Sequence, residues 1–223
     1  MNKYNIYFKS DSGFKKKIWD ITANNSVLGS KMCHILPFVH AFSGCDTVSR
    51  MYGIGKPQLL KKAISDPYFK CQADVFLKGS NHDQIEAAGK QIVSALYNGN
   101  VQEELDSLRY RKCVQKVNSS STVLQVQTLP PTKAATKYHS YRAYLQVKQW
   151  TGTNCAPLEW GCCHQDDKPF PLKTDSPAAP ERLLKIIHCS CKVNCDTRKC
   201  TCRKHALTCS IACGNCKALV VAT

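Results

Sequence analysis

The chain has 223 residues, 43% apolar and 21% charged, which is enough to bury a core in one medium or two small domains and excludes disorder throughout. Lysine and arginine number 31 against 16 aspartates and glutamates, and the net charge of +15 favours nucleic acid or another polyanion as partner. No stretch approaches about 18 consecutive apolar residues, so we expect no membrane span. The first ten residues contain no secretory signal, so we expect a cytosolic or nuclear protein with reduced thiols.

The N-terminal segment predicts a β-hairpin. Residues 5–8 and 17–21 are rich in β-forming side chains and flank the turn-forming residues 10–13. The apolar run at 32–42 then predicts a buried helix, in which Pro37 is best tolerated near the first turn.

Residues 43–64 contain a glycine turn followed by a helix. Gly53 and Gly55 can turn the chain tightly between two helices, and Pro57 suits the first position of the second helix. The backbone N–H groups at that helix start, beside Lys56, can cradle a phosphate. The alternative is a plain connection between two helices.

With its flanks, this segment resembles the flap-endonuclease-like branch of the PIN-type nucleases. The likeness covers residues 35–64, where a helix ends in Gly-Cys-Asp46 and a helix-hairpin-helix-like turn follows. The resemblance implies that Asp46 helps to hold Mg²⁺ or Mn²⁺ and that Gly53, Gly55 and Lys56 contact DNA. A two-metal site needs several converging carboxylates, and only Asp46 has a counterpart here. Asp46 can alternatively cap a helix. We therefore expect a catalytically incomplete, nuclease-like fragment rather than an enzyme.

Helical patterns dominate the middle of the chain. We expect a short helix or irregular segment at 68–76, a helix at 83–97 capped by Ser80 or Asn81, and a helix at 102–117. Polar residues from Asn118 and the pair Pro130-Pro131 interrupt the pattern before a further helix at 132–150, whose tyrosines we expect to pack in a core. Five prolines predict that residues 152–180 are loop-like.

Eight cysteines then follow with the spacing C-x-C-x3-C-x4-C-x-C-x6-C-x3-C-x2-C. They are Cys189, Cys191, Cys195, Cys200, Cys202, Cys209, Cys213 and Cys216. The segment is too short for a hydrophobic core, whereas zinc bound by thiolates supplies folding free energy on the order of 10 kcal/mol per site. A secreted disulfide scaffold is the alternative, and its secretory signal is missing. Eight unshared thiolates satisfy two tetrahedral zinc ions, while three ions require bridging sulfurs or help from His188 or His205.

This spacing resembles the tesmin-type CXC domain, and the likeness covers residues 187–217. The resemblance implies a DNA-binding zinc cluster, which in that family has nine cysteines around three ions with shared sulfurs. No cysteine follows Cys216, so we expect two or three Zn²⁺ ions.

Residues 181–223 carry eight basic and two acidic side chains, a balance of +6. Among these, Arg198, Lys199, Arg203 and Lys204 are the predicted DNA contacts, with a merely solvated basic face as the alternative. In the CXC family a tyrosine before the second C-x-C enters the minor groove. Lys199 occupies that place in this chain. A cation there favours recognition of the shape of the DNA groove over recognition of its base sequence.

The sequence thus predicts a mainly α protein with a short N-terminal β-hairpin and three parts. A partial nuclease-like α/β body spans 1–117, a proline-rich linker containing the helix at 132–150 spans 118–180, and a zinc-cluster domain with little regular structure spans 181–223. The two resemblances together suggest uncharacterised, mobile-element-related animal proteins located in the nucleus. DNA binding is the expected function, with a divalent-metal nuclease remnant or a chromatin protein-interaction module as alternatives.

Overall fold

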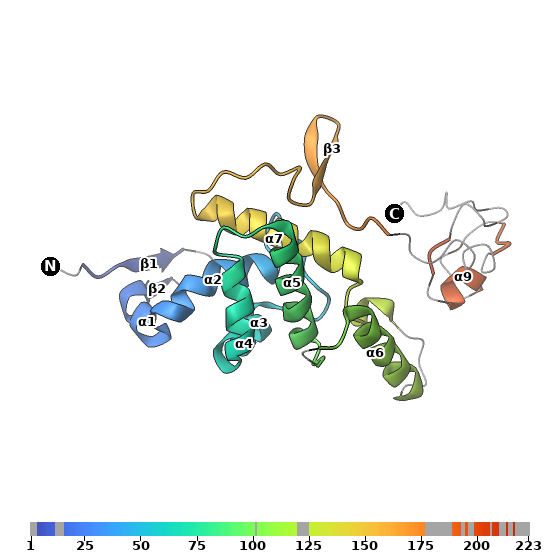
Figure 1. Cartoon of the computed structure of the whole chain (residues 1–223), viewed down its shortest axis with the longest axis horizontal. Coiled ribbons are helices and arrows are strands. Elements are labelled where there is room, and N and C mark those ends of the chain that lie inside the picture. The colour runs from blue at the N-terminus through green and yellow to red at the C-terminus, as the bar shows by residue number, and fades with distance from the viewer. Residues whose placement is uncertain are drawn as a thin grey trace.

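The computed structural model describes residues 4–11, 16–100, 102–119 and 125–176. In the cysteine-rich segment it describes 189–192, 195, 199–205, 207–209, 213 and 216. Within these residues the protein is mainly helical and begins with an antiparallel β-hairpin, which confirms the predicted fold class (Figure 1). No helix in the described part is both long and apolar enough to cross a membrane.

The N-terminal hairpin consists of β1 (Tyr7–Ser10) and β2 (Lys17–Asp20), with Phe8 opposite Trp19. The predicted second strand ends one residue early, because the Asp20 carboxylate accepts a hydrogen bond from the Ala23 N–H and caps α1 (Ile21–Leu28). We did not predict α1. It buries no residue completely, so its sequence has no apolar stripe to reveal it.

The predicted buried helix is α2 (Ser30–Phe42). It begins earlier than expected, after Gly29, so Pro37 lies in the middle of the helix rather than near its first turn. The helix continues through this proline because one of its sides is buried in the core. That side consists of Met32, Ile35, Phe38, Val39, Ala41 and Phe42.

Four phenylalanines form the centre of the core. The Phe38 ring is tilted against those of Phe76 and Phe42, with ring centroids 4.8 Å and 5.2 Å away, and Phe69 meets Phe38 edge-on at 6.4 Å. Phe69 lies on α4 (Pro67–Val75), which follows α3 (Lys56–Ser65). All four side chains are at most 1% exposed, so the N-terminal helices are joined through one aromatic cluster.

The next two helices were predicted from their sequences, by a capping residue for the first and by a stripe of apolar residues in both. In α5 (His82–Leu96), Asn81 accepts a hydrogen bond from the Gln84 N–H, and Gln84 accepts one from the Asn81 N–H, which is a capping box. The helix α6 (Leu105–Ser119) buries Leu105 and Leu108 as predicted, and a short 3₁₀ turn η1 (Val126–Thr128) follows it.

The helix expected inside a linker occupies the middle of the body instead. This is α7 (Lys133–Trp150), which packs against α2 and α5 (Figure 1). It is buried on every side from His139 to Lys148. Its polar side chains are satisfied by neighbouring elements. His139 Nε2 lies 3.0 Å from the Phe42 carbonyl, and Lys148 Nζ donates to the Leu77 carbonyl at 3.0 Å. Two tyrosines of this helix, Tyr141 and Tyr144, are buried against Trp160, as the packing prediction required.

The segment predicted as a loop contains a second hairpin, so that prediction was wrong for part of its length. The strands are β3 (Cys162–Gln165) and β4 (Lys168–Pro171). Asp166 and Asp167, between the strands, have φ of 50° and 57°, a left-handed conformation that aspartate tolerates and that suits a two-residue hairpin turn. Prolines are accepted in β4 because this two-stranded sheet has only edge strands.

Candidate metal centre

The cysteine-rich segment buries sulfur instead of hydrocarbon. Six cysteines pack against one another with exposures of 6% or less, and half-buried Cys191, Cys209 and Leu207 lie at their margin. The six are Cys189, Cys195, Cys200, Cys202, Cys213 and Cys216. Leu207 is the only hydrophobic residue other than cysteine that packs on this group in the described part of the chain. Among the described residues of this segment, hydrocarbon burial therefore contributes little to the packing.

The sulfur atoms are spaced as ligands of a metal. Cys189 Sγ lies 3.8 Å from Cys195 Sγ and 3.7 Å from Cys209 Sγ, and Cys202 Sγ lies 3.5 Å from Cys213 Sγ. A disulfide bond is only about 2.05 Å long, and all cysteines are free thiols. In a tetrahedral zinc site with Zn–S bonds of about 2.3 Å, two sulfurs are about 3.8 Å apart. The sulfur positions thus fit zinc and differ from those of a disulfide scaffold.

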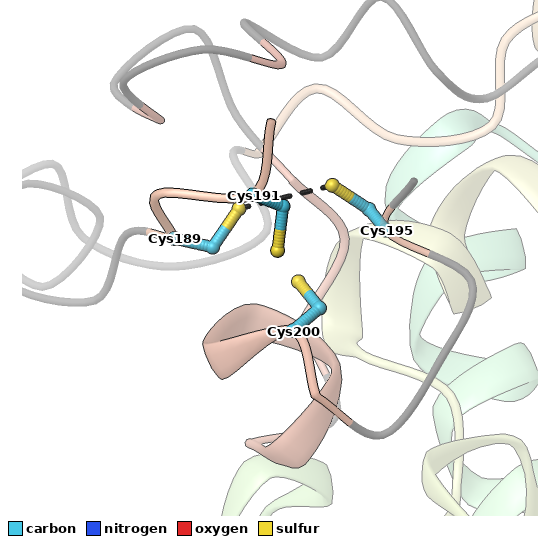
Figure 2. A group of neighbouring side chains, drawn as sticks. All are labelled: Cys189, Cys191, Cys195 and Cys200. Carbon is cyan, nitrogen blue, oxygen red and sulfur yellow. Dashed lines mark hydrogen bonds between the residues drawn. The ribbon is translucent and has the colours of Figure 1, made fainter. Parts of the chain in front are cut away.

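Three overlapping groups of four cysteines have all their sulfurs within 4.8 Å of one another. Cys189 belongs to all three groups, and Cys195, Cys200 and Cys209 each belong to two. In Figure 2, Cys191 and Cys200 turn their sulfurs toward each other beside Cys189. Cys213 joins through its contact with Cys202, so all eight predicted ligands come together. A cysteine that belongs to two groups can bind two metal ions at once, as a bridging thiolate does.

The surroundings of Cys200 lower the pKa of its thiol. It is the N-cap residue of α9 (Thr201–Lys204). Burial raises its pKa, but the backbone N–H of Arg203 and neighbouring thiols outweigh this effect and lower the pKa to about 7. Burial raises the pKa of Cys195 to about 11 and also raises that of Cys209. Without a cation these sulfurs cannot all be thiolates, and a soft divalent metal removes that penalty.

Basic side chains surround this centre. Lys192, Lys199, Arg203 and Lys204 are exposed, and two of them belong to α9, whose first residue directly follows Cys200. Arg198 and His188 lie outside the described residues. His205 is exposed and belongs to none of the ligand groups found among the described residues. Three of the four predicted DNA contacts are therefore on the surface next to the sulfur cluster.

The glycine turn forms where the sequence predicted it. Gly53 has φ of 71°, Gly55 is the N-cap of α3, and Pro57 lies in the first turn of that helix. The expected phosphate cradle is partly occupied by the protein, because the Gly55 N–H donates to the Gln58 side chain and Lys56 Nζ donates to the Gly44 carbonyl at 2.9 Å.

Asp46 is exposed in the turn between α2 and α3. It caps neither helix, because Ser43 ends α2 and Gly55 begins α3, so that alternative was wrong. Among the described residues, only cysteines form groups of three or more potential metal ligands.

One polar site was missed by the sequence interpretation. Arg50, Thr136 and Arg142 line a single cavity, although they come from a loop and from the helix that we had assigned to a linker. No regular spacing connects such distant residues, so only the fold reveals the site.

Comparison of the chain with protein-family models, with curated proteins and with solved structures finds no match. The interpretation of the sulfur cluster therefore depends on its own geometry. That geometry defines a candidate metal centre, and the cysteines present suit zinc.

Proposed function

We propose that this protein is a zinc-dependent DNA-binding protein whose cysteine cluster presents a basic surface to duplex DNA. The observation that carries the proposal is the convergence of eight cysteines at separations suited to zinc, with exposed lysines and arginines on the same short segment. The resemblance to the tesmin-type CXC domain supports the same function. A nuclear location agrees with free thiols and with a DNA partner.

Zinc has a structural role in this proposal. The metal takes the place of a hydrophobic core, which the described residues of the segment do not form, and it neutralises thiolates that would otherwise repel one another. The folded segment then holds Lys199, Arg203 and Lys204, together with Arg198, against the phosphates. Each phosphate contact releases counterions, so the affinity for DNA falls as the salt concentration rises.

Two or three ions fit the ligand count. Eight unshared thiolates fill two tetrahedral sites, whereas a third ion requires sulfurs that bind two metals. Cys189 is the leading candidate for a bridging sulfur, because it belongs to all three groups. Metal analysis of the purified chain decides between these numbers.

The test combines metal analysis with duplex binding by the full chain. The protein, its Cys200→Ser variant and its Cys71→Ser variant are each assayed for bound zinc and titrated with a fluorescent DNA duplex. Cys71 is the matched control because it is exposed on α4 and outside the cluster. We expect Cys200→Ser to lose zinc and duplex binding together, and Cys71→Ser to retain both.

Two results would contradict the proposal. Full duplex binding after zinc has been removed with a chelator would separate DNA recognition from the metal. Stoichiometric zinc without salt-sensitive binding of DNA would instead point to a protein-interaction module.

A further inference from the structure

A cavity lies between the loop before the glycine turn and the first half of α7. Its volume is about 270 Å³, and α5 contributes one wall through Val93. The polar residues that line it are Ser49, Arg50, Thr136, His139, Arg142 and Lys173. Arg50, Arg142 and Lys173 are cations, and no acidic residue among those described lines the cavity. His139 is neutral at physiological pH, because burial lowers its pKa to about 4.

The three cations have no carboxylate partner in the described part of the chain. Arg142 is 7% exposed, and its guanidinium donates to the carbonyls of Gly161 and Leu172, which carry no charge. The side chains of Arg50 and Lys173 are exposed and form no ion pair or hydrogen bond within the described residues. The cavity therefore concentrates uncompensated positive charge around a small, half-open volume.

An unpaired hydroxyl lies at the same place. Thr136 is completely buried, and its Oγ1 has no hydrogen-bond partner among the described residues. The nearby Ser140 hydroxyl is occupied, because it donates to the Thr136 carbonyl at 2.8 Å. Buried hydroxyl groups are almost always hydrogen-bonded, so the free donor of Thr136 calls for an acceptor that the described part of the chain does not supply.

The backbone fixes the position of Arg50. Gly44 has φ of 101°, and a Cβ at this position would lie 2.8 Å from Arg50 Cβ and 2.9 Å from Arg50 Cα. Only glycine lets the two backbone segments approach so closely. The close packing holds Arg50 beside the cavity before any ligand arrives.

We propose that this cavity binds a phosphate monoester group. A phosphate offers only acceptor oxygens and up to two negative charges, and the cavity offers guanidinium, ammonium and hydroxyl donors. A volume of about 270 Å³ lies at the lower end of the range for ligand pockets, which suits one phosphate with a small organic group. The group can belong to a small molecule or to the phosphorylated end of a nucleic acid strand.

The test is calorimetric titration of the full, zinc-loaded chain in phosphate-free buffer. The probes are inorganic phosphate, adenosine 5′-monophosphate, and one short oligonucleotide carrying either a 5′-phosphate or a 5′-hydroxyl. Tighter binding of the 5′-phosphorylated strand than of the 5′-hydroxyl strand identifies the nucleic acid end as the source of the group, because any contact with the basic cysteine-rich segment is the same for both strands. Equal binding of the two strands, together with binding of the monophosphate, identifies the small ester.

Two variants locate the site. Arg50→Gln changes an exposed side chain and should weaken monophosphate binding about tenfold or more, the loss expected for a charge-assisted hydrogen bond. Thr136→Val should weaken it about three- to tenfold, while the unfolding temperature without ligand stays the same or rises because the unpaired hydroxyl is gone. Lys61→Gln, on the exposed side of α3, is the control and should bind as the unaltered chain does.

The proposal is overturned if none of the phosphate probes binds at millimolar concentration. It is also overturned if Arg50→Gln and Thr136→Val bind as tightly as the control, or if acetate competes as well as phosphate does. None of these outcomes bears on zinc or duplex binding, so the two proposals stand or fall separately.

Discussion

The buried histidine of α7 makes the stability of the helical body depend on pH. His139 is 6% exposed, its ring meets Phe42 edge-on, and its Nε2 lies 3.0 Å from the Phe42 carbonyl. Burial is the main cause that lowers its pKa from 6.5 to about 4, and the charge of Arg142 acts in the same direction. The other cations that line the same cavity are the exposed Arg50 and Lys173.

The sign and size of the effect follow from this shift. Above pH 6.5 the histidine is neutral in both the folded and the unfolded chain, and the folded state has its full stability. As the pH falls from 6.5 toward 4, the unfolded chain takes up a proton that the folded chain refuses, so the free energy of unfolding decreases. The difference between the two pKa values corresponds to a loss of about 3 kcal/mol.

Urea denaturation followed by helical circular dichroism measures this loss. The free energy of unfolding is determined at several pH values from 7.5 to 4.5 for the unaltered chain, for His139→Gln and for His40→Gln. His40 is the control because it is exposed on α2. We expect the decrease to be much smaller in His139→Gln and unchanged in His40→Gln. Zinc release at low pH affects all three proteins alike and cancels in the comparison. An equal decrease in all three would refute the assignment to His139.

Three further predictions concern packing and DNA contact. Gly89→Ala places a methyl group 1.9 Å from Ser140 Oγ where α5 crosses α7, and it should lower the free energy of unfolding by about 1–3 kcal/mol, whereas Gly79→Ala, which meets nothing within 4 Å, should change it little. Phe38→Ala empties the centre of the aromatic cluster and should cost about 3–5 kcal/mol in the same assay, so a loss below 1 kcal/mol would show that the cluster is misplaced. Lys204→Gln should reduce the slope of log affinity for duplex DNA against log salt by about one while leaving the zinc content intact, and an unchanged slope would remove Lys204 from the interface.

Local signals in the sequence were sufficient for several elements. The capping box at Asn81 and the stripe after it predicted α5, because the residues that start and bury this helix are neighbours along the chain. The cysteine spacing predicted the sulfur cluster for the same reason, since all eight ligands fall within one short segment.

Features that depend on distant contacts were not predicted. We placed α7 in a linker, yet its His139 and Lys148 are buried in the body because carbonyls of α2 and of the chain after α4 accept their hydrogen bonds. The second hairpin was hidden because a count of prolines does not reveal a turn in which two aspartates adopt a left-handed conformation. The phosphate cavity was hidden as well, since its walls come from four separate parts of the chain.

The central position of α7 determines when the body can finish folding during synthesis. The contacts that enclose this helix join residues far apart along the chain, such as Phe42 with His139 and Thr47 with Gln146. A nascent chain that ends before residue 133 has already made α2 and α5 but exposes the faces that α7 will cover. Such an intermediate is prone to aggregate. The ribosome must therefore release the chain to the end of α7, at Trp150, before the N-terminal helices reach a stable arrangement.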